Sequence, residues 1–154
     1  MVVLSNSTGY AIRALACLSG LGCEPKFVRD IAKCSGVPAP YLAKLVQRLA
    51  EAGIVNSKRG YRGGIILARK PDEISLLEID EAVEGGAHPD RCLLGMDDCS
   101  DARACPTHAF WKKTRADIRK TLLDTTLADV LAFETKKQAA TGSRSKKPST
   151  KKPL

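Results

Sequence analysis

A pair of helical patterns joined by the tripeptide Gly36-Val37-Pro38 constrains the fold of this chain more than any other feature. Residues 28–35 predict a short helix, which the glycine ends by taking a left-handed backbone conformation. Residues 40–52 predict an amphipathic helix, because apolar side chains recur there every three or four residues. A short helix, a glycine-containing turn and an amphipathic helix form a helix-turn-helix, and we expect the chain to fold around this motif.

Helices and a hairpin are predicted on both sides of this motif. Residues 6–20 carry apolar side chains at helical spacing. Residues 54–67 predict a β-hairpin wing, because two β-branched runs enclose a glycine-rich tip. Ser75 and Glu78 form a capping box that starts a further short helix, which ends near Glu84. The expected fold class is mainly α with a small β-hairpin, a winged helix-turn-helix.

The C-terminal part predicts a long dimerisation helix from Thr107 to about Leu123. Its apolar side chains at helical spacing are Phe110, Trp111, Ile118 and Leu122. This is more apolar surface than one small winged helix covers, so we expect a homodimer that buries this helix. A short last helix is predicted to end near Phe133.

The expected organisation has four parts. They are a winged helix-turn-helix DNA-binding domain over 1–86, a cysteine-containing cluster-binding loop over 87–106, a dimerisation helix with a short terminal helix over 107–134, and a disordered basic tail over 135–154. No stretch approaches the roughly 18 to 20 apolar residues of a membrane span, and the start lacks the pattern of a secretory signal. We therefore expect a cytoplasmic protein with no membrane partner, whose six cysteines are thiols or ligands rather than disulfides.

Charge is strongly segregated along the chain. Residues 26–70 contain ten Lys or Arg and two acids, whereas residues 71–101 contain ten acids and one Arg. One face is therefore expected to attract a polyanion. Because the basic segment coincides with the helix-turn-helix and the wing, this bias indicates double-stranded DNA as the partner. The chain lacks a Ser/His/Asp set, a nucleotide-binding loop and paired catalytic carboxylates, so we do not expect an enzyme.

The second helix of a helix-turn-helix reads DNA with side chains near its N-terminus. Here several of these side chains fall outside the apolar stripe, and the wing adds cations beside glycines whose backbone can approach phosphates. The candidate DNA-binding residues are Pro40, Tyr41, Lys44, Arg48, Lys58, Arg59 and Arg62. Taken alone, each of these residues also fits the alternative that it is an ordinary solvent-exposed residue without a partner molecule. Their combination on the reading helix and the wing favours DNA.

The six cysteines fall into two groups. Three lie in or beside the first two predicted helices, and we expect no metal role for them: Cys17, Cys23 and Cys34. We expect Cys17 to be a small buried hydrophobic residue and Cys34 to be a thiol on the helix surface or half-buried. The others share one polar loop with a histidine: Cys92, Cys99, Cys105 and His108. Three thiolates and one imidazole make a complete four-ligand set. Their open spacing suits an iron-sulfur cluster better than structural zinc, and a disulfide or free thiols are the alternatives.

The combination of these motifs resembles the iron-sulfur cluster regulator (IscR) family of bacterial transcription factors. The resemblance covers residues 1 to about 133 and is carried by the helix-turn-helix, the wing, the 75–84 segment and the run from Cys92 through Cys105-Pro106-Thr107-His108-Ala109-Phe110-Trp111. It implies a homodimer in which each 107–123 helix crosses to the other subunit, bound to a pseudo-palindromic operator.

The resemblance also implies roles for individual residues. It implies that a 2Fe-2S cluster is held by Cys92, Cys99, Cys105 and His108, and that DNA is contacted by Tyr41, Lys44 and Arg59. Nitric-oxide-sensing relatives of the 4Fe-4S type use an acidic residue in the first helix, and residues 5–13 contain none, which favours 2Fe-2S over 4Fe-4S. Six residues separate the first two loop cysteines, where many relatives have five, and the basic tail lies outside the family pattern.

The expected function is transcriptional regulation, with operator binding controlled by an iron-sulfur cluster that senses iron-sulfur, redox or nitric oxide status. Two alternatives stay open at this point. The first is a thiol-switch regulator without a cluster. The second is a carrier that passes metal or clusters to other proteins, which would not need the arginines of the wing.

Overall fold

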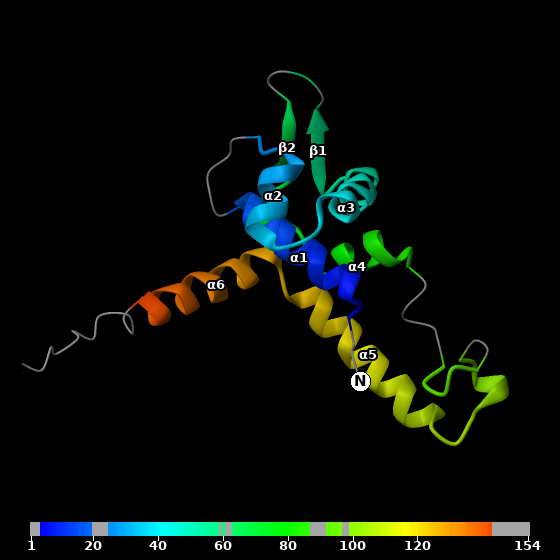
Figure 1. Ribbon diagram of the computed structural model, residues 1–154. Coiled ribbons are helices and arrows are strands. Elements are labelled where there is room, and N and C mark those ends of the chain that lie inside the picture. Colours follow the sequence, from blue (N-terminus) through cyan, green and yellow to red (C-terminus); the bar gives the residue numbers. More distant parts are fainter. Residues whose placement is uncertain are drawn as a thin grey trace, which may run out of the picture.

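The structure is a computed structural model that describes residues 4–19, 25–58, 60, 63–86, 92–96 and 99–142, with side chains up to residue 136. In chain order the elements are α1 (Asn6–Ser19), α2 (Val28–Ser35), α3 (Ala39–Glu51), β1 (Val55–Lys58), β2 (Gly64–Leu67), the 3-10 turn η1 (Pro71–Glu73), α4 (Leu76–Glu84), the 3-10 turn η2 (Asp101–Arg103), α5 (His108–Asp124) and α6 (Leu127–Gly142). The expected fold class, mainly α with a hairpin wing, is confirmed (Figure 1). No helix in the described part of the chain is both long and apolar enough to cross a membrane.

Helix α1 lies at the centre of the body. It contacts α2, α3, α4, α6 and strand β2 (Figure 1). Its inward positions recur at helical spacing and are fully or nearly fully buried: Ala11, Ala14, Leu15 and Leu18. The surrounding elements add the other large buried side chains, among them Ile31, Leu42, Leu49, Ile54, Ile74, Ile79 and Leu127. One hydrophobic core therefore supports the helix-turn-helix, the wing and α4 together.

The predicted helix-turn-helix is formed by α2 and α3. Helix α2 ends at Gly36, which has a φ of 69° and donates its N–H to the Ala32 carbonyl at 2.9 Å. Helix α3 follows Pro38 directly and buries the apolar stripe of Leu42, Leu45, Val46 and Leu49. Its bounds differ by one residue at each end from the predicted 40–52.

The wing is a two-stranded antiparallel pair that Lys26 extends on one side. The register places Lys58 opposite Gly64, and the Lys26 main chain exchanges two hydrogen bonds with Ile65, at 3.0 and 2.8 Å. This approach requires glycine at position 64. Its φ is 149°, and an added Cβ would lie 2.7 Å from the Pro25 Cβ.

Helix α4 begins with the predicted capping box. The Ser75 Oγ accepts a hydrogen bond from the Glu78 N–H at 3.2 Å, and the Glu78 carboxylate accepts from the Ser75 N–H at 3.0 Å and from Arg69 at 2.8 Å. Burial raises the pKa of Glu78, but the hydrogen bonds from Ser75 and Arg69 together outweigh it, so the pKa lies below the ordinary 4.5.

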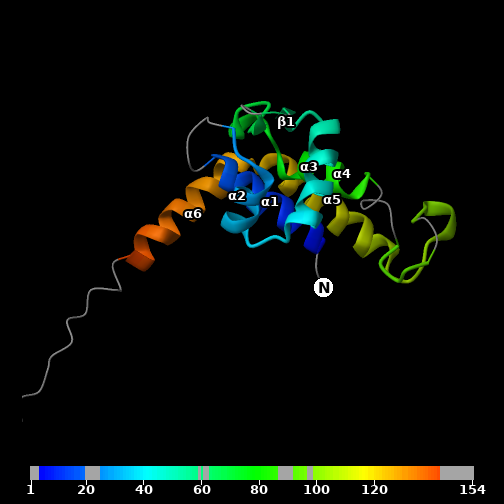
Figure 2. The same cartoon turned by 45° about the horizontal axis from the view of Figure 1, so that its top comes forward.

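The junction between α5 and α6 is fixed to the start of α4. The Leu127 N–H donates to the Ile74 carbonyl at 2.8 Å, and the Leu76 N–H donates to the Thr125 carbonyl at 2.9 Å. Leu127 is also fully buried in the core. From this anchored point the two helices leave the body in different directions, α5 toward the cysteine loop and α6 away from it (Figures 1 and 2).

The terminal helix is longer than predicted. We expected a short helix to Phe133 and disorder from residue 135, whereas α6 continues to Gly142. Residues 135–141 contain Lys, Gln and Ala, which favour helix, and no proline or glycine interrupts them before Gly142. The expectation of a disordered tail is therefore wrong for 135–142, and residues 143–154 lie outside the described part.

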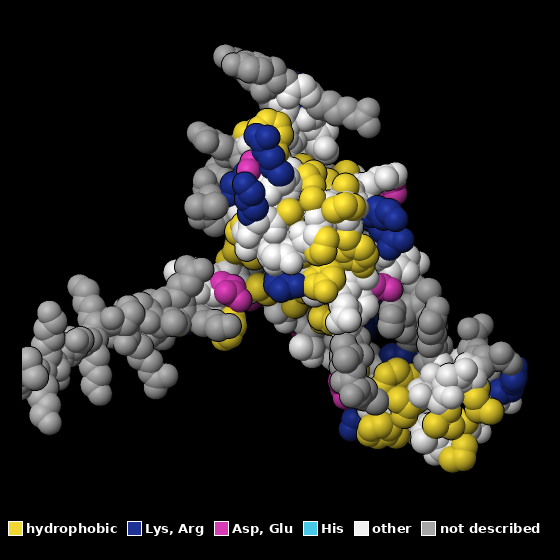
Figure 3. Space-filling model, in the orientation of Figure 1, with side chains coloured by type: hydrophobic (Ala, Val, Ile, Leu, Met, Phe, Trp, Pro, Cys, Tyr) yellow, Lys and Arg dark blue, Asp and Glu magenta, His cyan; other side chains and the backbone are white. Residues whose placement is uncertain are grey.

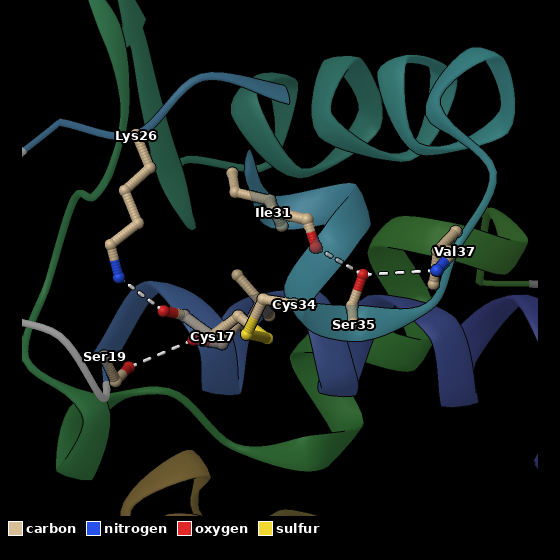
Figure 4. Close-up of a disulfide and its surroundings, with 8 residues drawn as sticks. Cys17, Ser19, Lys26, Ile31, Cys34, Ser35 and Val37 are labelled. Atoms are coloured by element: carbon tan, nitrogen blue, oxygen red, sulfur yellow. Dashed lines mark hydrogen bonds between the residues drawn. A yellow bond between two sulfur atoms is a disulfide. The ribbon is translucent and has the colours of Figure 1, made fainter. Parts of the chain in front are cut away.

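Cys17 and Cys34 form a disulfide that joins α1 to α2, with their Cα atoms 6.1 Å apart (Figure 4). The expectation that all six cysteines are thiols or ligands is therefore wrong for this pair. The packing of α1 on α2 brings the two cysteines within bridging distance. The sequence does not reveal this packing, because the two cysteines are 17 residues apart and lie in separate helices. Cys23 lies outside the described residues, and the cysteines of the 87–106 loop are free.

Candidate nucleic-acid interface and cysteine pocket

The N-terminal half of α3 presents the predicted reading surface to solvent. Pro40, Tyr41 and Lys44 are exposed, while the apolar stripe of the same helix faces the core. Figure 3 shows Lys and Arg side chains on either side of this upper body. An exposed helix N-terminus with a nearby cation fits the docking of a reading helix in a major groove.

The side chain of Tyr41 is oriented by two residues of α1. Its hydroxyl lies 2.5 Å from the Ser7 Oγ, and its ring packs edge-on against Tyr10 with the centroids 5.7 Å apart. The Arg13 guanidinium stacks over Tyr10 at 4.9 Å. The exposed position of Tyr41 was predicted from the sequence. Its contacts with α1 were not, because no spacing rule relates residues of separate helices.

Arg48 is exposed and lies outside the apolar stripe of α3, as the sequence predicted. Its guanidinium donates a hydrogen bond to the main-chain carbonyl of Val83 in the last turn of α4. A cation at the C-terminal end of a helix satisfies a carbonyl that has no partner within the helix. The side chain therefore links the reading helix to α4 while it stays on the solvent side of α3.

The wing is only partly described. Lys58 ends β1 and is exposed, as predicted. The other two wing candidates, Arg59 and Arg62, lie outside the described residues. The DNA contacts of all seven candidates stay predictions.

The predicted ligand residues line one pocket at the start of α5. The cavity measures about 390 Å³. Its polar donors are Cys92, Cys99, Cys105, Arg103 and His108, and its rim carries Leu94, Met96 and Pro106. Met96 is 66% exposed, and hydrophobic side chains gather on this loop in Figure 3. The fold thus brings together four residues that are spread over 17 positions of the sequence.

His108 is the first residue of α5 and is only 8% exposed. Its Nδ1 lies 3.2 Å from the Cys99 Sγ, and its Nε2 lies 2.9 Å from an Asp101 carboxylate oxygen. Lys112 donates to the same carboxylate at 2.8 and 2.9 Å. The hydrogen bonds from Lys112 and then from His108 lower the pKa of Asp101. The imidazole is therefore held between a thiol and an ionised carboxylate.

The surroundings of Cys105 favour its thiolate form. Hydrogen bonds from the Thr107 hydroxyl, at 3.3 Å, and from its main chain lower the pKa of the Cys105 thiol, and Cys92 adds to the effect. Thiolates are the form that binds metal. Cys92 therefore lies next to Cys105, and Cys99 lies next to His108.

The pocket gathers the metal-binding donor types of the loop. Within the described residues, no three His, Cys, Asp or Glu side chains converge closely enough to hold one metal ion. The pocket presents three thiols and one imidazole, which are donor types that iron-sulfur clusters and soft metal ions take. Asp101, which contacts His108, lies within the same loop.

A chain of contacts joins α5 to the reading helix. Arg119 of α5 pairs with Glu81 of α4 at 2.9 Å. Two residues further along α4, the Val83 carbonyl receives Arg48 of α3, and next to it Glu84 accepts a hydrogen bond from Ser5. The last turn of α4 therefore contacts the reading helix, the start of α1 and the long helix that begins at the cysteine pocket.

Known proteins are similar to this chain in sequence and in fold. Residues 4–132 match the Rrf2 family, described as iron-dependent transcriptional regulators. The transcriptional regulator IscR of Sodalis glossinidius is 31% identical over 134 residues, which are 85% of this chain and 79% of the relative. The structure of CymR from B. subtilis is similar with a TM-score of 0.69 at 28% identity, over 86% of this chain and 98% of that one. The T. potens IscR structure is similar with a TM-score of 0.67 at 29% identity, over 94% and 93%.

The fold, a winged helix-turn-helix with a long projecting helix, is similar to that of known transcriptional regulators, and the matching relatives are transcriptional regulators. This chain belongs to the Rrf2 family, and its expected likeness to IscR is confirmed. The expectation that it is not an enzyme is confirmed as well, since the family and the relatives consist of transcriptional regulators.

Proposed function

We propose that this regulator is a homodimer that binds double-stranded operator DNA under the control of an iron-sulfur cluster, of the 2Fe-2S rather than the 4Fe-4S type. The observation that carries the proposal is the single pocket lined by Cys92, Cys99, Cys105 and His108. The proposed division of the chain follows the expected one, with residues 1–86 binding DNA, 87–106 forming the cluster loop and the long helix after it forming the dimer contact.

The proposed ligands would hold the cluster through three thiolates and the His108 imidazole. A bound cluster supplies a centre that can be assembled, lost or oxidised as cellular conditions change. Cys105 favours its thiolate through Thr107, and Asp101 orients the imidazole from the opposite nitrogen. Asp101 is itself held by Lys112, one turn along α5.

The cysteine loop adjoins α5, so a ligand that orders the loop can affect DNA binding through this helix. The loop 87–106 connects α4 to α5 directly, and His108 begins α5. The Arg119–Glu81 pair carries a shift of α5 to α4, and the Arg48–Val83 hydrogen bond carries it to the reading helix. Ligand occupancy in the loop can thus bias the placement of α3.

The apolar surface of α5 supports the homodimer. Phe110 is 64% exposed and Leu123 is 55% exposed, and His108 is the only residue of this 17-residue helix that is buried within one chain. Phe133 of α6 adds a further exposed aromatic ring. A second copy of the chain covering this helix would remove these side chains from water and set the spacing of the two reading helices.

Purification without oxygen, followed by iron and sulfide analysis, tests the proposal. We expect two irons and two sulfides per chain, visible absorption, and operator affinity that changes when the cluster is removed. Cys92→Ala should abolish the cluster, whereas Cys34→Ala, outside the pocket, should retain it. A colourless protein without iron, whose operator affinity is the same in every preparation, would contradict the proposal.

A thiol-switch regulator without a cluster is the second candidate. The structure similar to this chain with a TM-score of 0.69 is the global cysteine regulator of B. subtilis, and the present chain contains a disulfide in its DNA-binding part. Visible absorption after anaerobic purification separates the two candidates, since only a cluster absorbs there.

A further inference from the structure

We propose that Cys17 and Cys34 form a reversible dithiol–disulfide site, at which peroxide and low-molecular-weight thiols act on the helix-turn-helix itself. This site is separate from the cysteine pocket of the loop. The inference goes beyond the proposed cluster function and does not rest on it, because both cysteines lie outside the proposed ligand set.

Both cysteines line a second cavity. Cys34 is exposed and Cys17 is half-buried, and both line a cavity of about 480 Å³ between α1, α2 and α6. Arg13 of α1 and Glu134 of α6 are among the residues that line this cavity. A cavity of this size with one cation and one anion suits a small zwitterionic thiol of the amino-acid or short-peptide class.

The Cys17–Cys34 pair is connected through neighbouring residues to the turn before α3 and to the wing (Figure 4). Cys34 precedes Ser35, whose Oγ donates to the Ile31 carbonyl at 2.7 Å and accepts from the Val37 N–H at 3.4 Å, so it fixes the turn that leads into α3. On the other side, the Cys17 carbonyl accepts a hydrogen bond from the Lys26 Nζ at 2.6 Å. Lys26 pairs with the wing, so the disulfide unites α1, the turn and the wing strand.

The reaction is a two-electron exchange. A thiolate of the pair attacks peroxide, which breaks the O–O bond and leaves a sulfenic acid and hydroxide, and the hydroxide becomes water by taking up the proton that the thiol released. The second thiol then displaces the sulfenic oxygen as a second water, so two thiols and one peroxide yield one disulfide and two waters. In the reverse direction one small thiol attacks the exposed Cys34 sulfur to form a mixed disulfide. A second small thiol then releases the reduced pair and a small-molecule disulfide.

The first test follows the covalent state in the full-length chain. The protein is equilibrated with mixtures of reduced and oxidised glutathione, quenched with acid, alkylated and digested with trypsin. Cys23→Ser is the background, because Cys17 and Cys23 share the tryptic peptide 14–26 while Cys34 lies in 34–44. We expect these peptides to be linked under oxidising mixtures, and alkylated under reducing ones. A link that never forms, or one that no reducing mixture opens, would overturn the reversible site.

The second test measures its effect on DNA binding. Cluster-free wild-type protein and cluster-free Cys34→Ser are each titrated with operator DNA after oxidation by peroxide and after reduction. The loop cysteines are identical in both proteins, so any difference between them belongs to this pair. We expect oxidation to tighten operator binding by roughly threefold or more in the wild type, through preorganisation of the turn and the wing, and to leave Cys34→Ser unchanged. An equal response in both proteins would overturn the proposal.

Thermal unfolding gives a readout that needs no DNA. Linking residues 17 apart restricts the unfolded chain, so the oxidised wild type should unfold at a midpoint several degrees above the reduced form. Cys34→Ser should show no such difference. Loss of the cluster would leave this shift in place, so the failure of the cluster proposal and the failure of this one are distinguishable. If the oxidised and reduced wild-type proteins unfold at the same midpoint, the Cys17–Cys34 disulfide does not stabilise the fold and the proposal is contradicted.

Discussion

The Thr8 hydroxyl of α1 donates a hydrogen bond of 2.7 Å to the Asp80 carboxylate of α4, and the two residues are 0% and 7% exposed. Because both residues are buried, removing the Thr8 hydroxyl leaves the Asp80 carboxylate without this donor in a place with little access to water. Thr8→Val keeps the shape of the side chain but removes the donor, and we expect it to lower the free energy of unfolding by about 1–3 kcal/mol. Chemical denaturation measures this loss.

Thr135→Val is the matched control for this prediction. Thr135 is exposed on α6, and its hydroxyl donates to the Leu131 carbonyl of its own helix. Its substitution should change the free energy of unfolding by less than about 0.5 kcal/mol. An equal decrease in the free energy of unfolding for both variants would contradict a stabilising role of the hydrogen bond between α1 and α4.

The two cations of the reading helix should behave differently when each is replaced by alanine. Lys44 is exposed on the solvent side of α3, so Lys44→Ala should weaken operator binding, reduce the slope of log affinity against log salt by about one, and leave stability unchanged. Arg48→Ala should instead lower stability as well, because it releases the Val83 carbonyl. Operator titrations at several salt concentrations, together with thermal unfolding, measure both effects. A Lys44→Ala chain with the wild-type affinity at every salt concentration would remove that residue from the interface.

The capping box of α4 predicts a loss of stability in acid. The hydrogen bonds from Ser75 and Arg69 lower the pKa of Glu78 in the folded chain below the ordinary 4.5, despite the opposing effect of burial. A carboxyl group with a lowered pKa stabilises the fold above its unfolded pKa, and this contribution is lost as the pH falls through the folded pKa. Glu78→Gln should therefore destabilise the protein at neutral pH and flatten the decline of stability below pH 4.5. Unfolding midpoints between neutral and acidic pH test this, and a parallel decline in both proteins would contradict it.

Most of the fold could be predicted from the sequence, because local signals determine it. The bounds of α2 followed from the pattern ended by Gly36, and the start of α4 followed from Ser75 and Glu78. The Cys17–Cys34 bridge and the Arg48–Val83 hydrogen bond could not be predicted, since each depends on how two helices pack. The grouping of Cys92, Cys99, Cys105 and His108 was predicted because they lie in one loop, whereas the hydrogen bond between Asp101 and His108 was not.

The exposed face of α5 predicts a dimer that single charges can break. Phe110 and Leu123 are largely exposed in one chain. Replacing either by Asp places a charge in the expected contact, so both variants should shift the protein toward monomer without lowering its helix content. Sedimentation at micromolar concentration measures the mass, and Leu94→Asp, in the loop rather than on the helix, is the control. A wild-type protein that sediments as a monomer would remove the dimer from the proposal.

The fourth ligand is the sharpest test of the cysteine pocket. His108 is nearly buried, and its Nδ1 faces the Cys99 sulfur at 3.2 Å while Asp101 holds the other nitrogen. His108→Ala should therefore shorten the lifetime of the cluster, and Cys105→Ala should abolish it, because no other thiolate of the described residues replaces that donor in the pocket. His108→Cys should retain a cluster with a lower reduction potential, since an anionic thiolate replaces a neutral imidazole. Anaerobic absorption spectroscopy and potentiometry measure these effects, with Cys17→Ala as the control that keeps the wild-type spectrum. An unchanged spectrum and lifetime in His108→Ala would show that the histidine is not a ligand, and the three cysteines would then hold the cluster without it.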